Sequence, residues 1–240
     1  MSLKEYKILG ARCISVKSLS EYKKHINEII SSGNGGYSVA INAEKIMFYQ
    51  ENEAIRDIID NSVLPSPDGV GALIGLKFLH QEKSIKVDLP KTILEIANEN
   101  SYKLFVLGAT LEVNNLAVKT IIKRYPNIEI VGQNDGFFKD DKQMIDTIVK
   151  TKPQIVMLAL GTPKQELLAV EVNKILKSVL LIGCGGALDV LAGKVKRAPL
   201  FIQNLHLEWL HRLIASPSRI KRQIVLPIFL FKVIKASFKK

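Results

Sequence analysis

Cysteine is scarce in this chain of 240 residues: only Cys13 and Cys184 occur, which excludes a disulfide-stapled secreted scaffold. The spacing of cysteine and histidine also matches no zinc site. The first residues lead into mixed polar sequence and lack the apolar core of a signal peptide. We therefore expect a cytoplasmic, reducing location.

The motifs of several nucleotide-dependent enzyme classes are also missing. Neither a Walker loop nor a Gly-x-Ser-x-Gly segment occurs, and no Asp-x-Asp pair follows a predicted strand. The lack of such a carboxylate pair argues against a Mg²⁺-dependent nucleotide-sugar site. The glycine cluster GCGG at 183–186 has the wrong spacing for a dinucleotide fingerprint. We expect neither a metal nor an organic cofactor.

The composition that is present is ordinary for a globular protein. Apolar residues make up 47% of the chain and charged residues 24%, which excludes general disorder. Short runs rich in β-branched residues predict buried strands at 37–42, 104–107, 128–132, 155–159 and 180–182. Apolar residues at helical spacing predict helices at 43–60, 90–100, 111–124, 141–150 and 163–177. This alternation predicts an α/β catalytic domain over 1–193, with an open, largely parallel, Rossmann-like sheet and helices on both faces.

Acidic residues nearly disappear in the last part of the chain. Residues 193–240 contain eleven Lys and Arg but a single acid, Glu208, so they carry +10 of the net charge of +11. A basic tail on a nearly neutral body indicates an anionic partner, either nucleic acid or a phospholipid surface, with a solubilising face as the alternative. The tail lacks the aromatic-interleaved basic face of single-strand binders and any helix-turn-helix unit. We therefore expect an anionic membrane surface and no nucleic acid as the partner.

We expect residues 194–240 to form a basic, helical, membrane-associating appendage. Helical stretches are predicted at 199–214 and 218–239, with Pro227 kinking or interrupting the second. The apolar run 224–234 is too short to cross a bilayer, which takes ~20 residues, but suits a helix that lies in the membrane interface. Packing on the body or on a second copy of the chain explains the same pattern equally well.

The residues that close the predicted strands are candidates for a site, because ligands bind outside the carboxyl ends of the strands in open parallel sheets. Asn42 ends the first run and either caps the next helix or offers an amide to a ligand. Gly108 closes the second run, where backbone N–H groups at a helix start could hold a phosphate. The loop 132–138 (GQNDGFF), with Phe137, suits a planar ring, and a packed turn explains it equally well.

Two further segments carry polar side chains, the first after the predicted strand 155–159 and the second in a loop rich in proline and glycine. In 161–166 (GTPKQE), the first helical turn places Lys164 and Gln165 toward any ligand at this edge. In the segment PSPDGVG, two prolines and two glycines fix the loop around Asp68, a candidate general base. The alternative is that Asp68 caps a helix beginning at Gly69.

Seven segments occur together in an order that is specific. They are VAINAEK (39–45), PDG (67–69), DGFFK (135–139), GTPKQE (161–166), GKVKRAP (193–199), LEWLHRL (207–213) and PSRIKRQ (217–223). With these segments the chain resembles the WecG/TagA/CpsF glycosyltransferases over nearly its whole length. The NAEK, PKQE, VKRAP and PSRIKRQ segments are most similar to the WecG branch.

The resemblance implies a metal-independent, inverting glycosyltransferase of cell-surface polysaccharide biosynthesis, peripheral on the inner face of the cell membrane. The implied donor is a UDP-sugar that carries N-acetylmannosaminuronic acid, N-acetylmannosamine or a related hexose. The implied acceptor is a sugar linked to undecaprenyl diphosphate.

The resemblance also implies site residues. It makes Asp68 the catalytic base. Together with two residues from the strand-end reasoning, the expected nucleotide-sugar pocket comprises Asn42, Gly108, Phe137, Gln165 and Asp189. The expected contacts to the lipid diphosphate and the membrane come from Arg212, Arg219, Lys221 and Arg222.

One segment departs from the family pattern. The usual R-x-x-G-x-D-L reads KSIKVDL at 83–89, and the stretch between Asp68 and this segment is shortened by several residues. Either Lys83 or Lys86 replaces the family arginine, and the sugar identity stays open. A homo-oligomer also stays open. The alternatives outside this family are a basic nucleic-acid-binding α/β protein and another nucleotide-dependent α/β enzyme, such as an oxidoreductase.

Overall fold

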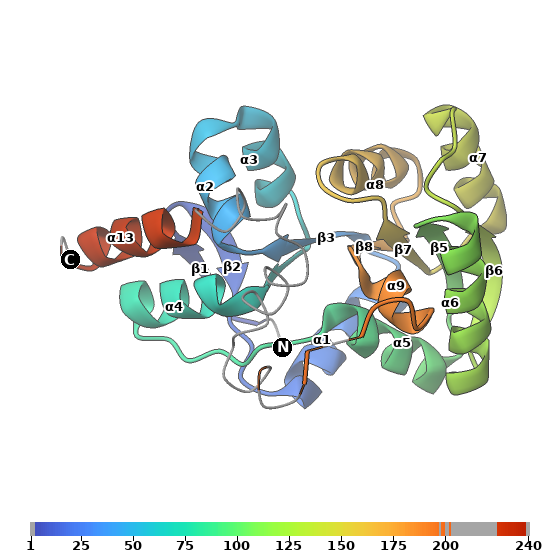
Figure 1. The fold of residues 1–240 in the computed structure, drawn as a ribbon, viewed down its shortest axis with the longest axis horizontal. Helices are drawn as coiled ribbons and strands as arrows, with labels where there is room; N and C mark the ends of the chain where they lie inside the picture. Colours follow the sequence, from blue (N-terminus) through green and yellow to red (C-terminus); the bar gives the residue numbers. More distant parts are fainter. Residues whose placement is uncertain (1–2, 197, 200–201, 203–224, 239–240) are drawn as a thin grey trace.

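The computed structural model describes residues 3–196, 198–199, 202 and 225–238. In these residues the main sheet is parallel throughout, with the strand order β4-β3-β8-β7-β5-β6 (Figure 1). Its strands are β3 (Gly36–Ile41), β4 (Leu64–Pro67), β5 (Lys103–Gly108), β6 (Glu129–Asn134), β7 (Ile155–Ala159) and β8 (Leu180–Gly183). A separate antiparallel hairpin pairs β1 (Glu5–Ile8) with β2 (Ala11–Ile14). The predicted parallel α/β fold is confirmed, with β4 and the hairpin as additions.

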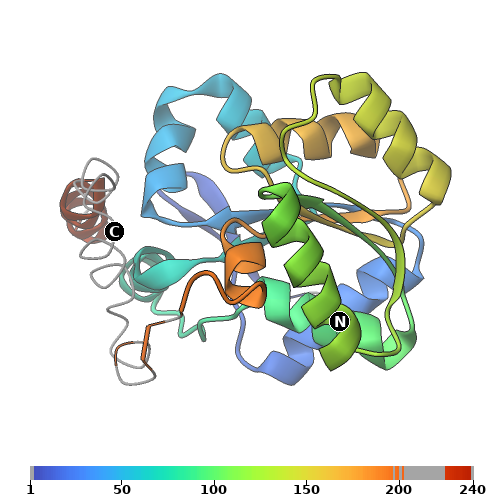
Figure 2. The same cartoon turned by 45° about the vertical axis from the view of Figure 1, so that its right-hand side comes forward.

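Helices cover both faces of the sheet, as Figures 1 and 2 show. One face carries α1 (Leu19–Ser31), α5 (Leu89–Asn100), α6 (Leu111–Arg124) and α9 (Ala187–Leu191). The other carries α2 (Ala43–Glu51), α3 (Glu53–Asp60), α7 (Asp141–Thr151) and α8 (Lys164–Ile175). Successive strand residues serve the two layers in turn: Leu104 packs in the first and Phe105 in the second. The strands are apolar on both sides because both sides are covered.

The predicted helix at 43–60 is divided in two. α2 ends before Asn52, whose side-chain oxygen accepts a hydrogen bond from the backbone N–H of Ile55 and so caps α3. An asparagine at this point favours a new helix start over continuation of the old helix, because its short side chain competes for backbone N–H groups.

The described part of the C-terminal tail packs on the body. α13 (Val225–Ser237) lies against α4 (Gly69–His80) and α2, with Phe229 and Val233 fully buried. α13 includes Pro227 as its third described residue, and the residues just before Val225 lie outside the described ranges, so the expected kink or break at Pro227 stays a prediction. Apart from residues 199 and 202, the predicted helix at 199–214 lies outside the described residues, as do residues 218–224 of the second predicted helix. The domain boundary at 194 stays a prediction.

Candidate active site

The carboxyl ends of the parallel strands lie along one edge of the sheet, and every described candidate follows one of them. In their order along this edge, by strand, the candidates are Asp68 (β4), Asn42 (β3), Asp189 (β8), Gln165 (β7), Gly108 (β5) and Phe137 (β6). The first four candidates follow four adjacent strands, and the ends of neighbouring strands are only ~4.8 Å apart. The topology therefore brings together residues that are up to 147 positions apart in the sequence, as Asn42 and Asp189 are.

Asp68 closes β4 and occupies the N-cap position of α4, but its side chain makes no cap hydrogen bond. Its backbone N–H donates to Ile41 O at 2.8 Å, which ties the end of β4 to the end of β3. The carboxylate is exposed. The helix-cap alternative is therefore wrong, and the carboxylate is not held by the backbone of α4.

Asn42 does cap a helix. Its side-chain oxygen accepts from the backbone N–H of Lys45 at 3.0 Å at the start of α2. Only the amide oxygen takes part in this cap, so the capping interpretation is confirmed and the ligand interpretation stays a prediction for the amide nitrogen.

Gly108 closes β5 with φ +127, and a Cβ atom there would lie 2.4 Å from Ala159 O. Only glycine allows this approach of β5 to β7. The next N–H, of Ala109, donates to the same Ala159 O at 3.1 Å. Thr110 Oγ1 accepts from the N–H of Val113 and caps α6. These internal bonds leave fewer N–H groups for a phosphate than the sequence suggests.

Asn114 on α6 is a site-building residue that sequence reasoning missed. Its buried Nδ2 donates to Gly108 O at 3.0 Å and to Asn134 O at 2.8 Å. One side chain thereby joins the ends of β5 and β6. A polar residue within the first turns of a helix that follows a strand-end glycine was the available signal.

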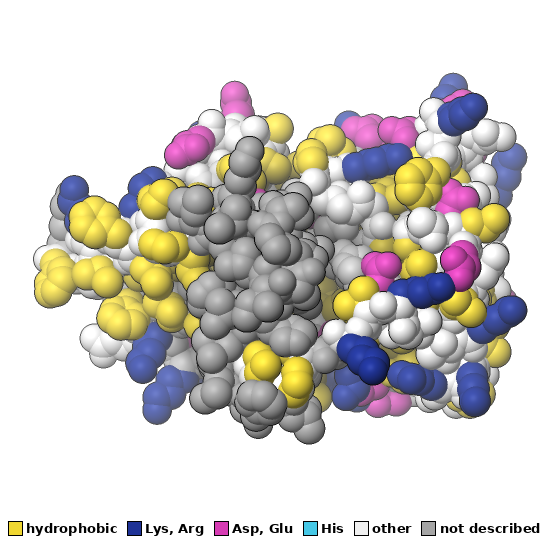
Figure 3. Space-filling view, in the orientation of Figure 1, with side chains coloured by type: hydrophobic (Ala, Val, Ile, Leu, Met, Phe, Trp, Pro, Cys, Tyr) yellow, Lys and Arg dark blue, Asp and Glu magenta, His cyan; other side chains and the backbone are white. Residues whose placement is uncertain are grey.

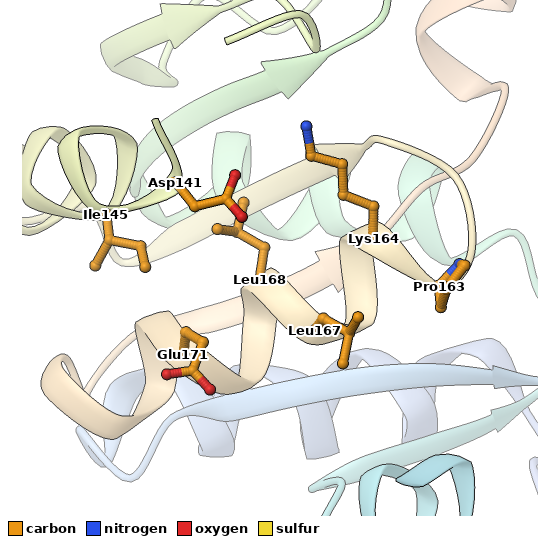
Figure 4. Close-up of a pocket in the computed structure, with 7 residues that line it drawn as sticks. All are labelled: Asp141, Ile145, Pro163, Lys164, Leu167, Leu168 and Glu171. Atoms are coloured by element: carbon orange, nitrogen blue, oxygen red, sulfur yellow. The ribbon is translucent and has the colours of Figure 1, made fainter. Parts of the chain in front are cut away.

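Phe137 lies in the loop between β6 and α7, is exposed, and lines a cavity of about 340 Å³. Its neighbour Phe138 packs instead, with the Lys164 ammonium 4.0 Å from its ring centroid. The packed-turn interpretation therefore holds for Phe138, whereas Phe137 is available to a planar ring. Lys164 also borders a cavity of about 260 Å³ between α7 and α8. Figure 4 shows the residues that line it, among them Asp141 on α7 and Glu171 on α8.

Asp189 lies on α9, half-buried, after the glycine-rich turn that follows β8. Its backbone carbonyl accepts from the N–H groups of Lys194 and Val195, which fixes the start of the segment 193–199 beside the sheet edge. In the same turn, burial raises the pKa of Cys184 to about 12, so this thiol is not a nucleophile at neutral pH.

A buried ion pair, absent from the sequence-based predictions, joins two of the strand-end helices. Lys45 Nζ on α2 lies 2.6 Å from Glu166 Oε1 on α8, with the side chains 8% and 5% exposed. The same oxygen accepts from Gln165 Nε2 at 3.0 Å and from Thr162 Oγ1 at 3.1 Å. Burial raises the pKa of Glu166, but the charge and hydrogen bond of Lys45 and the hydrogen bond of Gln165 outweigh it and lower the pKa below 4.5.

The segment that departs from the family pattern is anchored to the N-terminal hairpin by Glu82. This carboxylate accepts from Tyr6 Oη at 2.7 Å and from Ser15 Oγ at 2.9 Å, and pairs with Lys17 Nζ at 3.0 Å. The hydrogen bonds from Tyr6 and Lys17 lower the pKa of Glu82 to about 2. Of the two lysines that follow, Lys83 is exposed and Lys86 half-buried, and the choice between them as the family arginine stays open.

The tail residues expected at the lipid diphosphate, which are Arg212, Arg219, Lys221 and Arg222, lie outside the described residues. Within the described residues, no helix combines the length and the hydropathy needed to cross a bilayer.

A parallel sheet with helices on both faces defines an open α/β protein, a class in which ligands bind at the carboxyl edge where these carboxylate, amide and glycine residues lie. Comparison with known families makes the class specific: the profile described as "Glycosyl transferase WecG/TagA/CpsF family" matches residues 6–240. The chain belongs to this family and is a glycosyltransferase. The resemblance seen in the sequence motifs is confirmed.

Two bacterial relatives bear the same name, N-acetylglucosaminyldiphosphoundecaprenol N-acetyl-beta-D-mannosaminyltransferase. The protein of Bacillus spizizenii strain W23 is 28% identical over 221 residues, which cover 90% of this chain and 86% of the relative. The protein of Bacillus subtilis strain 168 is 34% identical over 182 residues, which cover 75% of this chain and 71% of the relative.

Proposed function

We propose that the chain transfers N-acetylmannosamine, N-acetylmannosaminuronic acid or a related hexose from a UDP-sugar to a sugar linked to undecaprenyl diphosphate. The transfer is inverting and metal-independent and belongs to cell-surface polysaccharide biosynthesis. The family and the names of the two relatives support the acceptor class. The observation that carries the reaction is the exposed carboxylate of Asp68, which makes no cap bond although it begins a helix at the ligand edge of the sheet.

In the proposed reaction Asp68 accepts the proton of the acceptor hydroxyl. The hydroxyl oxygen forms a bond to the anomeric carbon of the donor sugar while the bond from that carbon to the UDP oxygen breaks. Attack from the side opposite UDP inverts the anomeric centre. A hydroxyl is a poor nucleophile, so a base within hydrogen-bond reach of it accelerates this step.

The departing UDP carries a growing negative charge that the site must stabilise. In the proposed mechanism, backbone N–H groups at the strand ends and the side chains of Arg212, Arg219 and Arg222 stabilise this charge. The described residues contain no cluster of three His, Cys, Asp or Glu side chains suited to hold a metal ion.

The direct test is a transfer assay with UDP-N-acetylmannosamine and a synthetic polyprenyl-diphosphate-linked N-acetylglucosamine. We expect a lipid-linked disaccharide and one UDP per transfer, at a rate that EDTA does not change. A panel of other UDP-hexoses ranks the donors. Absence of product from every UDP-sugar would contradict the proposed donor, and loss of activity in EDTA would contradict metal independence.

We further propose that the protein binds the cytoplasmic face of an anionic membrane through α13 and the basic tail. α13 exposes an apolar stripe of Ile228, Phe231 and Ile234, each three positions apart, and Phe238 continues this stripe just beyond the helix. Figure 3 shows apolar side chains gathered at this end of the molecule. Phe231 is 67% exposed and Phe238 86%. An exposed apolar stripe next to lysines suits the membrane interface.

Replacing Phe231 and Phe238 together by Ser is expected to weaken binding to anionic vesicles at least about tenfold, because each phenyl ring contributes ~1.5–3 kcal/mol when buried. Co-sedimentation at high salt measures this loss without the electrostatic part. The control is Ile122→Ser, which should bind like wild type. Ile122 is also exposed, but it is on α6, which lies at the end of the molecule opposite α13 (Figure 1).

The basic part of the tail is tested separately by replacing Arg219, Lys221 and Arg222 by Glu. Each basic residue near an anionic surface contributes ~1 kcal/mol, so this variant should lose binding at low salt, and salt should weaken the wild type likewise. If both tail variants pellet like wild type, the membrane contact is elsewhere. A shift of the phenylalanine variant from dimer to monomer in size-exclusion chromatography would instead assign the stripe to a homo-oligomer.

A further inference from the structure

The buried ion pair between Lys45 and Glu166 takes no part in the proposed reaction steps. Each is the third residue of a helix that begins at the ligand edge of the sheet, α2 for Lys45 and α8 for Glu166. A buried charge pair is often no more stabilising than an apolar pair of the same volume, because both charges lose their water. A pair kept at this place therefore points to a role other than stability.

The pair decides how the amide of Gln165 is turned. A carboxylate only accepts hydrogen bonds, and Glu166 Oε1 accepts from Gln165 Nε2 at 3.0 Å and from Lys45 Nζ at 2.6 Å. With the amide reversed, the Gln165 oxygen would face a carboxylate oxygen. The ion pair thus holds the amide nitrogen toward Glu166 and the amide oxygen away from it.

The oxygen held in this way has nothing to bind within the described protein. Gln165 Oε1 is buried and lacks a hydrogen-bond partner among the residues that the structure describes. Native proteins rarely leave a buried acceptor without a donor. The amide lies at the end of β8, where a Cβ atom on Gly183 would be 2.6 Å from Gln165 Nε2. The acceptor is therefore at the ligand edge of the sheet.

We propose that Lys45 and Glu166 are positioning residues that hold the Gln165 amide oxygen ready for a hydrogen-bond donor of the nucleotide sugar. This inference rests on the proposed function and narrows the ligand chemistry, because the ligand group at this point must carry an N–H or O–H. The imide N–H of uracil and the hydroxyls of the sugar both meet this requirement. A phosphate oxygen does not, since it only accepts.

The double variant Lys45→Met/Glu166→Gln tests this role by calorimetric titration with UDP, N3-methyl-UDP and UDP-N-acetylmannosamine. Its new amide at position 166 can present either its oxygen or its nitrogen, so Gln165 is no longer held in one orientation. If the imide is the donor, UDP should bind the double variant about tenfold more weakly, and N3-methyl-UDP should bind both proteins alike. If a sugar hydroxyl is the donor, only UDP-N-acetylmannosamine should lose affinity.

The single variant Glu166→Gln separates positioning from stability. With Lys45 present, the substituted amide keeps its oxygen toward the ammonium, so Gln165 Nε2 keeps its acceptor. Ligand affinity should therefore fall more in the double variant than in Glu166→Gln. Thermal stability should follow the opposite order, because the single variant leaves the Lys45 charge buried without a carboxylate. A merely structural pair predicts that affinity follows stability, and that result would count against positioning.

Gln165→Met removes the acceptor and leaves the ion pair intact, so it tests the inference even where the double variant does not fold. It should lower the affinity for the same ligand whose affinity falls in the double variant. Equal binding of all three probes by Gln165→Met and by wild type would overturn the inference and leave the proposed function standing. If wild type binds neither UDP nor UDP-N-acetylmannosamine, the proposed donor is wrong, and the inference fails with it.

Discussion

Replacing Asp68 by Asn is expected to slow sugar transfer by about 10²–10⁴-fold, the usual cost of losing a general base. An amide of the same shape cannot take the proton of the acceptor hydroxyl. The fold should be unaffected, because the Asp68 side chain makes no cap hydrogen bond to α4 that the amide would have to replace. The loss should fall on kcat in the transfer assay.

Donor binding separates this role from a general disturbance of the site. UDP should bind the Asp68→Asn protein with a Kd within about threefold of wild type, since a proton acceptor for the other substrate contributes little to the nucleotide. Asp57→Asn is the matched control: the same substitution on an exposed residue of α3, a helix whose end leads into the start of β4 at the opposite edge of the sheet. Transfer by Asp68→Asn within about threefold of wild type would contradict its assignment as base.

Much of the sheet is predictable from local sequence because its strands are covered on both faces. β5, β7 and β8 are short apolar runs rich in branched side chains, and the predicted bounds lie within one residue of the observed ones. β4 escaped prediction because Leu64–Pro67 contains two prolines, which lack the N–H that a central strand needs. It is tolerated at the edge of the sheet, where it pairs with β3 alone.

The N-terminal hairpin shows a second limit of local signals. Its two-residue turn has positive φ at both Leu9 and Gly10. Such turns favour Asn-Gly or Asp-Gly, and a leucine in the first position gives no turn signal in the sequence. Tertiary packing selects the conformation there: Ile8 and Ala11, on either side of the turn, are fully buried.

Site residues that lie after a single strand could be predicted from the sequence, whereas contacts between residues that follow two different strands could not. The rule that ligands bind at carboxyl strand ends is enough to select Asn42, which follows β3 directly, and Gln165, which lies in the segment after β7. Asp68 was selected instead by the prolines and glycines around it, because β4 was not predicted. The pair of Lys45 and Glu166 is separated by 121 positions, and only the strand order β3-β8-β7 brings α2 and α8 together. Both residues lie inside the recognised segments NAEK and PKQE, yet neither segment alone indicates burial.

Replacing Lys45 by Met is expected to lower the free energy of unfolding by about 3–5 kcal/mol, because the carboxylate of Glu166 stays buried without its cation. The exposed pair of Lys174 and Glu171 is the matched control, since its 2.7 Å distance is nearly the same but its side chains are 63% and 53% exposed. Lys174→Met should cost no more than about 1 kcal/mol. Urea unfolding of both variants measures the difference, and equal losses would show that burial does not govern the pair.

The pH dependence of this loss gives an independent check on its cause. In the wild type the pKa of Glu166 lies below its ordinary value of 4.5, so the stability it contributes is present above that pH and is lost as the pH falls. Without Lys45, burial is opposed only by the remaining hydrogen bonds, which include those from Gln165 and from the backbone, so we expect it to raise the pKa of Glu166 above 4.5. The variant then binds a proton on folding and loses stability as the pH rises. The gap between wild type and Lys45→Met should therefore widen from pH 4 to pH 7, whereas a gap that is constant across this range would mean that lost packing, not the unpaired carboxylate, destabilises the variant.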